Sequence, residues 1–272
     1  MKTEFLVRAR HAVNHVSPNR MHDDGLPQKL GFRGALVLGA AIYGNMIRSV
    51  VAQHGENWLE NAEVSARFLK PVCSGDQLRV AVESLTSESG EPTYRISAFN
   101  ETVSGELAAT LETVMPDKHP LPDPKSLLQS NEWIGPVTRE RSWDLIEPGK
   151  AYRLLHHTLQ RSDNLAWAQV LEDCNPIFLE GATPPVHPAQ ILLQAAYGAS
   201  NQFRGDNAVH ASSRIRVRKL LRAGDEVTVL TVPAEKWERK GNHWITLYGA
   251  VRHDGDLCAE IYHTQIFRLR GT

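Results

Sequence analysis

Hydrophobic and polar positions along the chain follow one order of elements in the first half. Residues 4–13 alternate well enough to predict a strand, and a polar loop comes after them. Residues 34–53 then predict a helix that is apolar on every side, which is typical of a helix wrapped by other structure. Four alternating runs separated by turn residues predict antiparallel strands at 62–71, 77–85, 93–100 and 106–114.

The second half shows the same order. A strand is predicted at 151–159, and the run SDNLAWAQVLED predicts an amphipathic helix with Ser162 as its N-cap. Residues 187–203 predict a second apolar helix, whose first turn suits Pro188. Four more strands are predicted at 209–221, 226–235, 243–253 and 257–270. Residues 116–140 are rich in proline and predict a linker, so we expect domains at 1–115 and 141–272.

Individual residues repeat as well as elements. Five positions of the first apolar helix recur 154 residues later, where Ala35, Leu38, Ala41, Tyr43 and Gly44 match Ala189, Leu192, Ala195, Tyr197 and Gly198. Gly75-Asp76 recurs as Gly224-Asp225, 149 residues later. Two matches in the same order indicate an internal duplication, and the repeated tyrosines are interpreted as core packing. The pattern predicts an α+β fold of two tandem antiparallel sheets, each wrapped around a central apolar helix.

Composition and charge narrow the class of protein. The 272 residues include 30 basic and 31 acidic side chains, a net charge of -1, which argues against nucleic acid as a partner. The uncharged stretch between Arg33 and Arg48 is too short to span a bilayer, and the N-terminus has no signal-peptide pattern. Three distant cysteines match no zinc or disulfide spacing. We therefore expect a cytoplasmic protein without membrane contact or metal.

A polar cluster stands before the first apolar helix. Asn19, His22, Asp23 and Asp24 lie within six positions of one another. A histidine beside carboxylates is a common arrangement for proton transfer, since the carboxylate orients the ring. The same residues also suit a solvated turn, because Asp-Asp-Gly is itself a turn sequence.

Two loops carry a resemblance to a known family. The stretch LEDCNPIFLEGATPPVHPA supplies Asp173, Asn175, Pro176 and, before the helix, His187. In the first half, SPNRMHDD supplies Asn19 and His22. These loops resemble the Asp-x-Asn-Pro-x-His loop of the MaoC-like (R)-specific enoyl-CoA hydratases and dehydratases. Phe178 replaces the histidine in the second half, and Ser17 and Arg20 replace the aspartate and proline in the first. The resemblance implies a tandem, or double, hot dog fold.

The same resemblance implies hydration of an enoyl-CoA, or dehydration of a 3-hydroxyacyl-CoA. His22 would be the base, Asp23 would orient its ring, and Asn19 would hold the water or the loop. Gly34 and Ala35 are expected at the start of the first helix, where free N–H groups stabilise a developing enolate. Asp173, Asn175 and His187 are the candidates in the second half, with bracing of the loop as the alternative for the first two and packing for His187.

Other interpretations stay open at this point. Arg216 and Arg218 alternate along a strand, where they either meet the phosphates of coenzyme A or form a solvated face. His210 is interpreted as a strand residue.

The alternative functions are a hot dog thioesterase, with Asp23 or Asp24 as its carboxylate, and an inactive acyl-thioester-binding protein. The partner is an acyl-CoA or acyl-carrier thioester, no further cofactor is implied, and both a monomer and a homodimer are compatible with the duplication.

Overall fold

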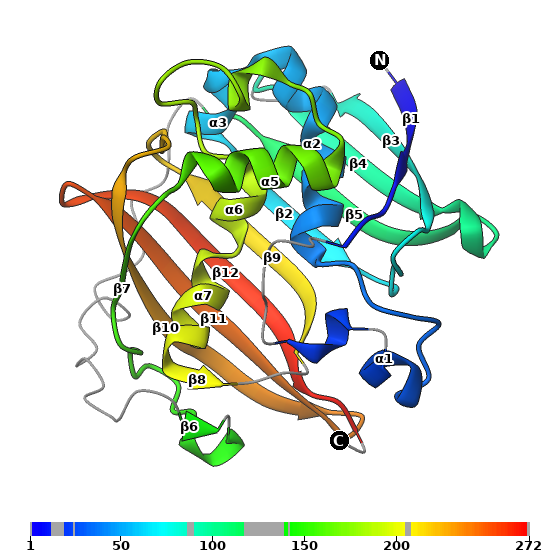
Figure 1. Cartoon of the computed structure of the whole chain (residues 1–272), viewed down its shortest axis with the longest axis vertical. Helices are drawn as coiled ribbons and strands as arrows, with labels where there is room; N and C mark the ends of the chain where they lie inside the picture. The colour runs from blue at the N-terminus through cyan, green and yellow to red at the C-terminus, as the bar shows by residue number, and fades with distance from the viewer. Residues whose placement is uncertain are drawn as a thin grey trace.

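A computed structural model shows how these elements are arranged (Figure 1). It describes residues 2–11, 19–23, 25–85, 90–116, 139–140, 142–204 and 208–270. The predicted linker lies almost entirely outside the described residues, and so do Ser17 and Asp24.

Ten strands form one antiparallel sheet. Its first half contains, in spatial order, β1 (Lys2–Arg8), β3 (Gln77–Leu85), β4 (Thr93–Asn100), β5 (Glu106–Val114) and β2 (Glu63–Phe68). Its second half continues with β9 (Val209–Val217), β12 (Asp256–Arg268), β11 (Asn242–His253), β10 (Glu226–Arg239) and β7 (Leu155–Thr158). A separate short parallel pair joins β6 (Arg139–Glu140) to β8 (Phe203–Arg204).

The expectation of two separate sheets is wrong in one respect. β2 pairs with β9, with Val64 opposite Ile215, so the two five-stranded halves join edge to edge. The pairing gives two otherwise exposed strand edges their hydrogen-bond partners. The central sheet is therefore shared by both halves, and strand order is mirrored about the β2–β9 seam.

The central helices differ between the halves. The first half has one continuous helix, α2 (Gly39–His54), followed by α3 (Glu56–Asn61), whereas the second has α6 (Pro188–Leu192) and α7 (Gln194–Gln202) with a break at Leu193. Figure 1 shows these helices on the same side of the sheet, α2 over β3–β5 and α7 over β10–β12. The remaining helices are α1 (Gly25–Lys29), α5 (Arg161–Leu171), and the short 3-10 segments η1 (Arg20–His22), η2 (Glu101–Val103), η3 (Trp143–Leu145) and η4 (Pro176–Phe178).

Two details of the predicted helices are corrected. α5 begins at Arg161 with Gln160 at its N-cap, so Ser162 lies inside the helix. α2 begins five residues after the predicted start, because the preceding residues form a β-bridge between Leu36 and Cys73 instead. The apolar character of α2 is explained by its burial, which includes Tyr43 in the core.

The internal repeat has a single register. The bridge from Leu36 to Cys73 has its counterpart from Pro185 to Arg222, and both residues of the second pair lie 149 positions after those of the first. The sequence comparison aligned the two helices with an offset of 154 residues. The structure gives 149 residues, so that alignment is wrong by five residues. Val37 corresponds to Val186, and the two residues that cap the central helices correspond as Leu38 and His187. Tyr43 consequently corresponds to Leu192 and not to Tyr197.

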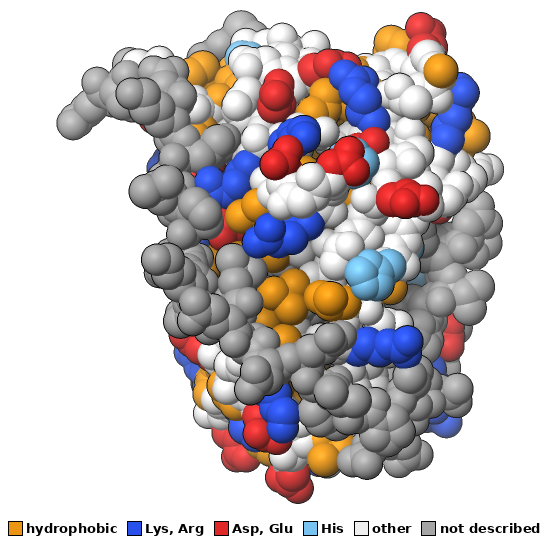
Figure 2. All heavy atoms as spheres, turned by 90° about the vertical axis from the view of Figure 1, so that its left-hand side faces the viewer, with side chains coloured by type: hydrophobic (Ala, Val, Ile, Leu, Met, Phe, Trp, Pro, Cys, Tyr) orange, Lys and Arg blue, Asp and Glu red, His pale blue; other side chains and the backbone are white. Residues whose placement is uncertain are grey.

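The surface carries mixed charge. On the face shown in Figure 2, acidic and basic side chains alternate among the described residues, without a patch of one sign. Among the described residues, no helix is both long enough and apolar enough to cross a membrane.

Candidate active site

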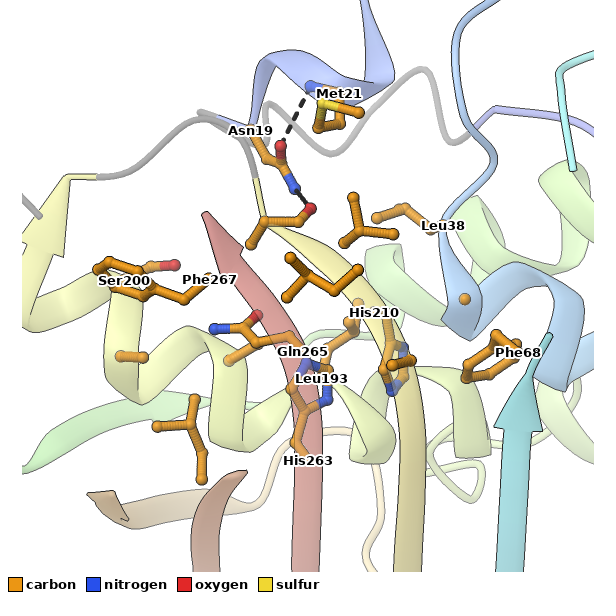
Figure 3. A pocket seen from close by; sticks show the side chains of 18 of the residues that line it. Asn19, Met21, Leu38, Phe68, Leu193, Ser200, His210, His263, Gln265 and Phe267 are labelled. Carbon is orange, nitrogen blue, oxygen red and sulfur yellow. Dashed lines mark hydrogen bonds between the residues drawn. The ribbon is translucent and has the colours of Figure 1, made fainter. Parts of the chain in front are cut away.

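One large cavity lies between the two halves. It has a volume of about 920 Å³ and reaches from the start of α2 into the space between α7 and the second half of the sheet. The first half contributes η1, the residues that lead into α2 and the end of β2. The second half contributes inward side chains of α7, β9, β11 and β12, several of which Figure 3 shows around the space. Neither half encloses this cavity alone.

His22 lies at the first-half end of the cavity, on η1. Its Nδ1 is 2.8 Å from the carbonyl oxygen of Leu36. A carbonyl only accepts, so Nδ1 carries the proton and Nε2 keeps its lone pair in the neutral ring. Burial lowers the pKa of His22, partly offset by the Leu36 carbonyl, which keeps the ring neutral at neutral pH. His22 therefore presents an unprotonated Nε2.

Asn19 braces this histidine. Its Oδ1 accepts from the backbone N–H of Met21, and its Nδ2 donates to the carbonyl of Ala208 at 2.8 Å (Figure 3). The same Nδ2 lies 3.4 Å from His22 Nε2. Asp23, by contrast, is exposed and does not line the cavity. The carbonyl of Leu36, and not Asp23, orients the His22 ring.

The start of α2 forms the adjoining wall. Leu38 is its N-cap residue, and the amides of Gly39 and Ala40 donate to no acceptor within the described part of the chain. These are the groups expected to stabilise an anion at a helix N-terminus. Gly34 and Ala35, predicted for that role, lie before the helix, where Ala35 accepts from Ser74 N–H.

Two further histidines face the same helix start, which sequence reasoning did not predict. A Cβ on Gly39 would collide with Nδ1 of His210 and come within 3.1 Å of Phe68 Cε2. The His210 ring stacks on His263 with 4.0 Å between centroids. His210 Nε2 is 2.8 Å from the hydroxyl oxygen of Ser213. His210 is in a strand as predicted, but it also lines the cavity.

The equivalent place in the other half is filled. The corresponding cavity has a volume of about 20 Å³ and is lined by Pro188, Lys219 and Leu221, the counterparts of Gly39, Lys70 and Val72. Trp58 occupies this side, and its indole N–H donates to Thr113, at the position that corresponds to His263. Of the two central helix starts, the first opens into a large cavity and the second does not, as judged from the described residues.

Asp173, Asn175 and His187 are not part of the large cavity. Asp173 accepts from the Asn175 N–H and Asn175 accepts from the Ile177 N–H, so both brace the loop, as the structural alternative predicted. His187 is 1% exposed, accepts from the Ala189 N–H through Nδ1, and has Nε2 3.9 Å from Asp173. Burial lowers the pKa of His187, with Asp173 opposing the shift. The structure thus separates these residues from His22.

The motif alignment itself is supported by local geometry. Asn19 caps η1 through Met21 N–H as Asn175 caps η4 through Ile177 N–H. His22 therefore corresponds to Phe178, whose ring packs 4.6 Å from His187. The first half keeps the loop histidine, and the second half keeps the aspartate.

Arg216 and Arg218 also lie away from the cavity. Arg216 Nε is 3.4 Å from Glu63 across the β2–β9 seam, and Arg218 contacts the buried carboxylate of Glu260. These contacts assign both guanidinium groups to ion pairs within the sheet. Among the described residues, Lys70 is the one basic Lys or Arg side chain that lines the cavity, where it pairs with Glu106 at 2.7 Å. The described residues contain no group of three or more candidate ligands arranged to hold a metal ion.

Comparison with known proteins identifies the fold. No family model and no curated protein matches the sequence. Among solved structures, a protein named as a MaoC domain dehydratase from Chloroflexus aurantiacus is 14% identical, with a TM-score of 0.70 over 100% of this chain and 96% of that one. A conserved hypothetical protein from Mycobacterium tuberculosis with a double hot dog fold is 12% identical, with a TM-score of 0.65 over 98% and 95%.

A protein named as an oleoyl thioesterase from Lactobacillus plantarum has a similar structure with a lower TM-score. It is 10% identical, with a TM-score of 0.53 over 99% of this chain and 98% of that one. Likeness at such identities shows a common fold and leaves the reaction open. The chain has the double hot dog fold seen in MaoC-like dehydratases.

Proposed function

We propose that the protein hydrates an enoyl thioester, or dehydrates the corresponding (R)-3-hydroxyacyl thioester, at the start of α2. The observation that carries this proposal is the hydrogen bond between His22 Nδ1 and the Leu36 carbonyl. The ring's Nδ1–H is held by this carbonyl, so Nε2 is a base within the cavity that also contains Gly39. The loop that carries His22 matches the hydratase loop in Asn19 and His22.

The reaction needs one base and one anion-binding group. The water oxygen bonds to C3 while the C2–C3 double-bond electrons move toward the thioester carbonyl. His22 Nε2 takes the water proton, the amides of Gly39 and Ala40 stabilise the enolate oxygen, and the proton is returned to C2. Water is added without a net change in the protein. Dehydration is the same path in reverse.

The missing aspartate does not prevent this path. A single histidine can take and return the same proton. The water oxygen that loses the proton bonds to C3, and the proton is delivered to C2, which is the neighbouring carbon. Asn19 contributes orientation, since its amide is held by Ala208 and faces His22 Nε2. A correctly placed base contributes about 10²–10⁴-fold to the rate.

Thioester hydrolysis is the second candidate. Asp163 is the one carboxylate among the described residues that line the cavity, and it accepts from Gln190 Nε2 at 2.8 Å. A carboxylate in this position could activate water toward the thioester carbonyl. Asp23, the carboxylate expected from the sequence, does not reach the cavity lining.

One assay separates these functions. Purified protein is mixed with trans-2-enoyl-CoA esters of several lengths, and loss of the conjugated absorbance and release of free thiol are followed together. We expect absorbance loss without thiol, reduced roughly 10²–10⁴-fold in His22→Ala. His156→Ala, an exposed histidine on β7, is the matched control.

Each contrary result has a clear meaning. Thiol release that survives His22→Ala and is lost in Asp163→Asn would favour hydrolysis. Binding of acyl-CoA without either signal would favour an inactive thioester-binding protein. Equal hydration by wild type and His22→Ala would refute the role given to His22.

A further inference from the structure

The wall of the cavity is polar at one place. Ser213 and His210 on β9, with His263 and Gln265 on β12, contribute side chains to one patch of the sheet (Figure 3). The Ser213 hydroxyl oxygen is 2.8 Å from His210 Nε2 and 3.5 Å from His263 Nδ1. The histidines and the serine are therefore coupled, whereas the surrounding lining is mainly apolar.

Gln265 differs from its neighbours in having no hydrogen-bond partner for its amide among the described residues. The residue is 7% exposed, lies opposite His210 in the β9–β12 ladder and lines the cavity. Figure 3 shows its side chain among those that point into the space. Because the amide faces the cavity, a ligand that displaces its water must supply a hydrogen bond in return.

The first half shows what an apolar alternative looks like. The β-ladders place Thr113 at the position of His263, and the next inward residue, Met115, at that of Gln265. Met115 is buried in the apolar core of its half. The fold therefore accepts methionine where the second half has glutamine, and the polar patch is a feature of the open site alone.

The charge of the patch limits the chemistry of its ligand. Burial lowers the pKa of His210 to well below its ordinary value, and the neighbouring His263 lowers it further. The His210 ring is neutral at neutral pH for this reason. Lys70, the one Lys or Arg among the described lining residues, is half exposed and paired with Glu106. Among the described lining residues, a carboxylate on the acyl chain would thus meet no Lys or Arg that lacks a carboxylate partner, whereas a neutral oxygen would find donors and acceptors.

We infer that the cavity selects an acyl chain that carries a neutral oxygen substituent, a hydroxyl or keto group, whose oxygen bonds to the Gln265 amide. This inference rests on the proposed function, because it takes the acyl thioester as the ligand. An unsubstituted alkyl chain would displace water from the Gln265 amide without offering a hydrogen bond in place of the one lost. A site built to bond a polar group rejects the analogue that lacks it more strongly than an apolar pocket rejects an added hydroxyl.

The test measures binding and does not depend on turnover. Saturated acyl-CoA esters of one chain length are compared by titration calorimetry, with the chain unsubstituted or with a hydroxyl or keto group moved one carbon at a time. For the wild type, we expect the best oxygenated ester to bind about tenfold tighter or more than the unsubstituted one. In Gln265→Met, which copies Met115, we expect that ratio to fall to one or below.

The outcomes separate the two proposals. If the wild type binds the unsubstituted ester as tightly as every oxygenated ester, the inference is overturned while the proposed function stands. If no ester binds, both the inference and the acyl-thioester function are refuted. If Gln265→Met keeps the wild-type preference, Gln265 is not the recognising group and the inference fails. Binding of the unsubstituted ester by Gln265→Met at least as tightly as by the wild type shows that a lost preference does not come from misfolding.

Discussion

At the scale of single residues, His22 shows how a backbone group fixes side-chain chemistry. The Leu36 carbonyl bonds Nδ1, so the lone pair that can take a proton is on Nε2. Leu36 is itself held by a β-bridge to Cys73, and its N–H donates to Met21. The proposed base is thus supported by the bridged segment that leads into α2 and not by an acidic side chain.

The pH dependence of activity is the first prediction at this scale. Burial lowers the pKa of His22 from its usual 6.5, and only the neutral ring is a base. Hydration should therefore be constant above the lowered pKa and fall as pH drops through it, with the midpoint of the fall below pH 6.5. The measurement is kcat/KM against pH for the free enzyme. An acid limb centred above 6.5, or an unchanged limb in His22→Ala, would contradict this assignment.

Gly39 carries the second residue-scale prediction. An added Cβ would collide with the His210 ring and crowd Phe68, so Gly39→Ala must displace one of them. We expect kcat/KM to fall by about 10²-fold, since small displacements in a site have effects of that order. Gly34→Ala is the matched control, because nothing lies within 4 Å of the added Cβ. Activity in Gly39→Ala equal to that in Gly34→Ala would show that the helix start tolerates a side chain.

At the scale of elements, the same turn precedes β3 and β10. Asp76 accepts from the backbone N–H of Cys73, and Asp225 accepts from that of Arg222, at corresponding positions. Gly75 and Gly224 supply the positive φ of +92° and +103° that these turns need. Asp76 accepts in addition from Asn100 and Arg33. The duplicated turn is therefore more heavily bonded beside the open site.

This difference predicts unequal costs for the same substitution. Asp76 is 3% exposed, so Asp76→Ala leaves buried donors unpaired and should lower the free energy of unfolding by roughly 3 kcal/mol. Asp225→Ala, at a partly exposed position, should cost about 1 kcal/mol. Urea unfolding of both variants measures the difference. Equal loss in the two would show that Asn100 and Arg33 add nothing to the first turn.

At the scale of the whole molecule, the two halves of the duplicated fold differ in the space at their central helix starts. One central helix start opens into a cavity of about 920 Å³, and its counterpart into about 20 Å³. Tyr43, Trp58 and Leu59 fill the smaller space. The second half, in turn, has the broken helix α6–α7, and the large cavity extends beside it. The first half thus supplies His22 and the open helix start, and the second half supplies much of the cavity lining.

Binding stoichiometry tests this division. Titration with a saturated acyl-CoA should saturate at one equivalent per chain, because the second space has no room for an acyl group. Phe178→His restores the loop histidine of the second half, yet the stoichiometry should stay at one, since Trp58 still fills the space. Two equivalents of equal affinity in the wild type would refute the single site.

The sequence by itself determined the order of elements and much of the loop chemistry. Period-two alternation is local information, and it placed β3, β4 and β5 at their observed bounds. Gly-Asp turns and the Asn caps of η1 and η4 are also local, because donor and acceptor lie two or three residues apart. Local sequence patterns also singled out His22, which lines the cavity, and the internal repeat.

Tertiary structure decided which of these residues act together. The sequence gives no sign that His210, His263 and Gln265 are more than ordinary strand residues. They line the cavity because β9 and β12 lie beside the start of α2, which is more than a hundred residues earlier in the chain. The start of α2 moved to Gly39 because the bridge to Cys73 competes for the preceding backbone. Strand pairing and side-chain packing act over long sequence separations, and no periodicity within a segment encodes which of two similar cavities is filled.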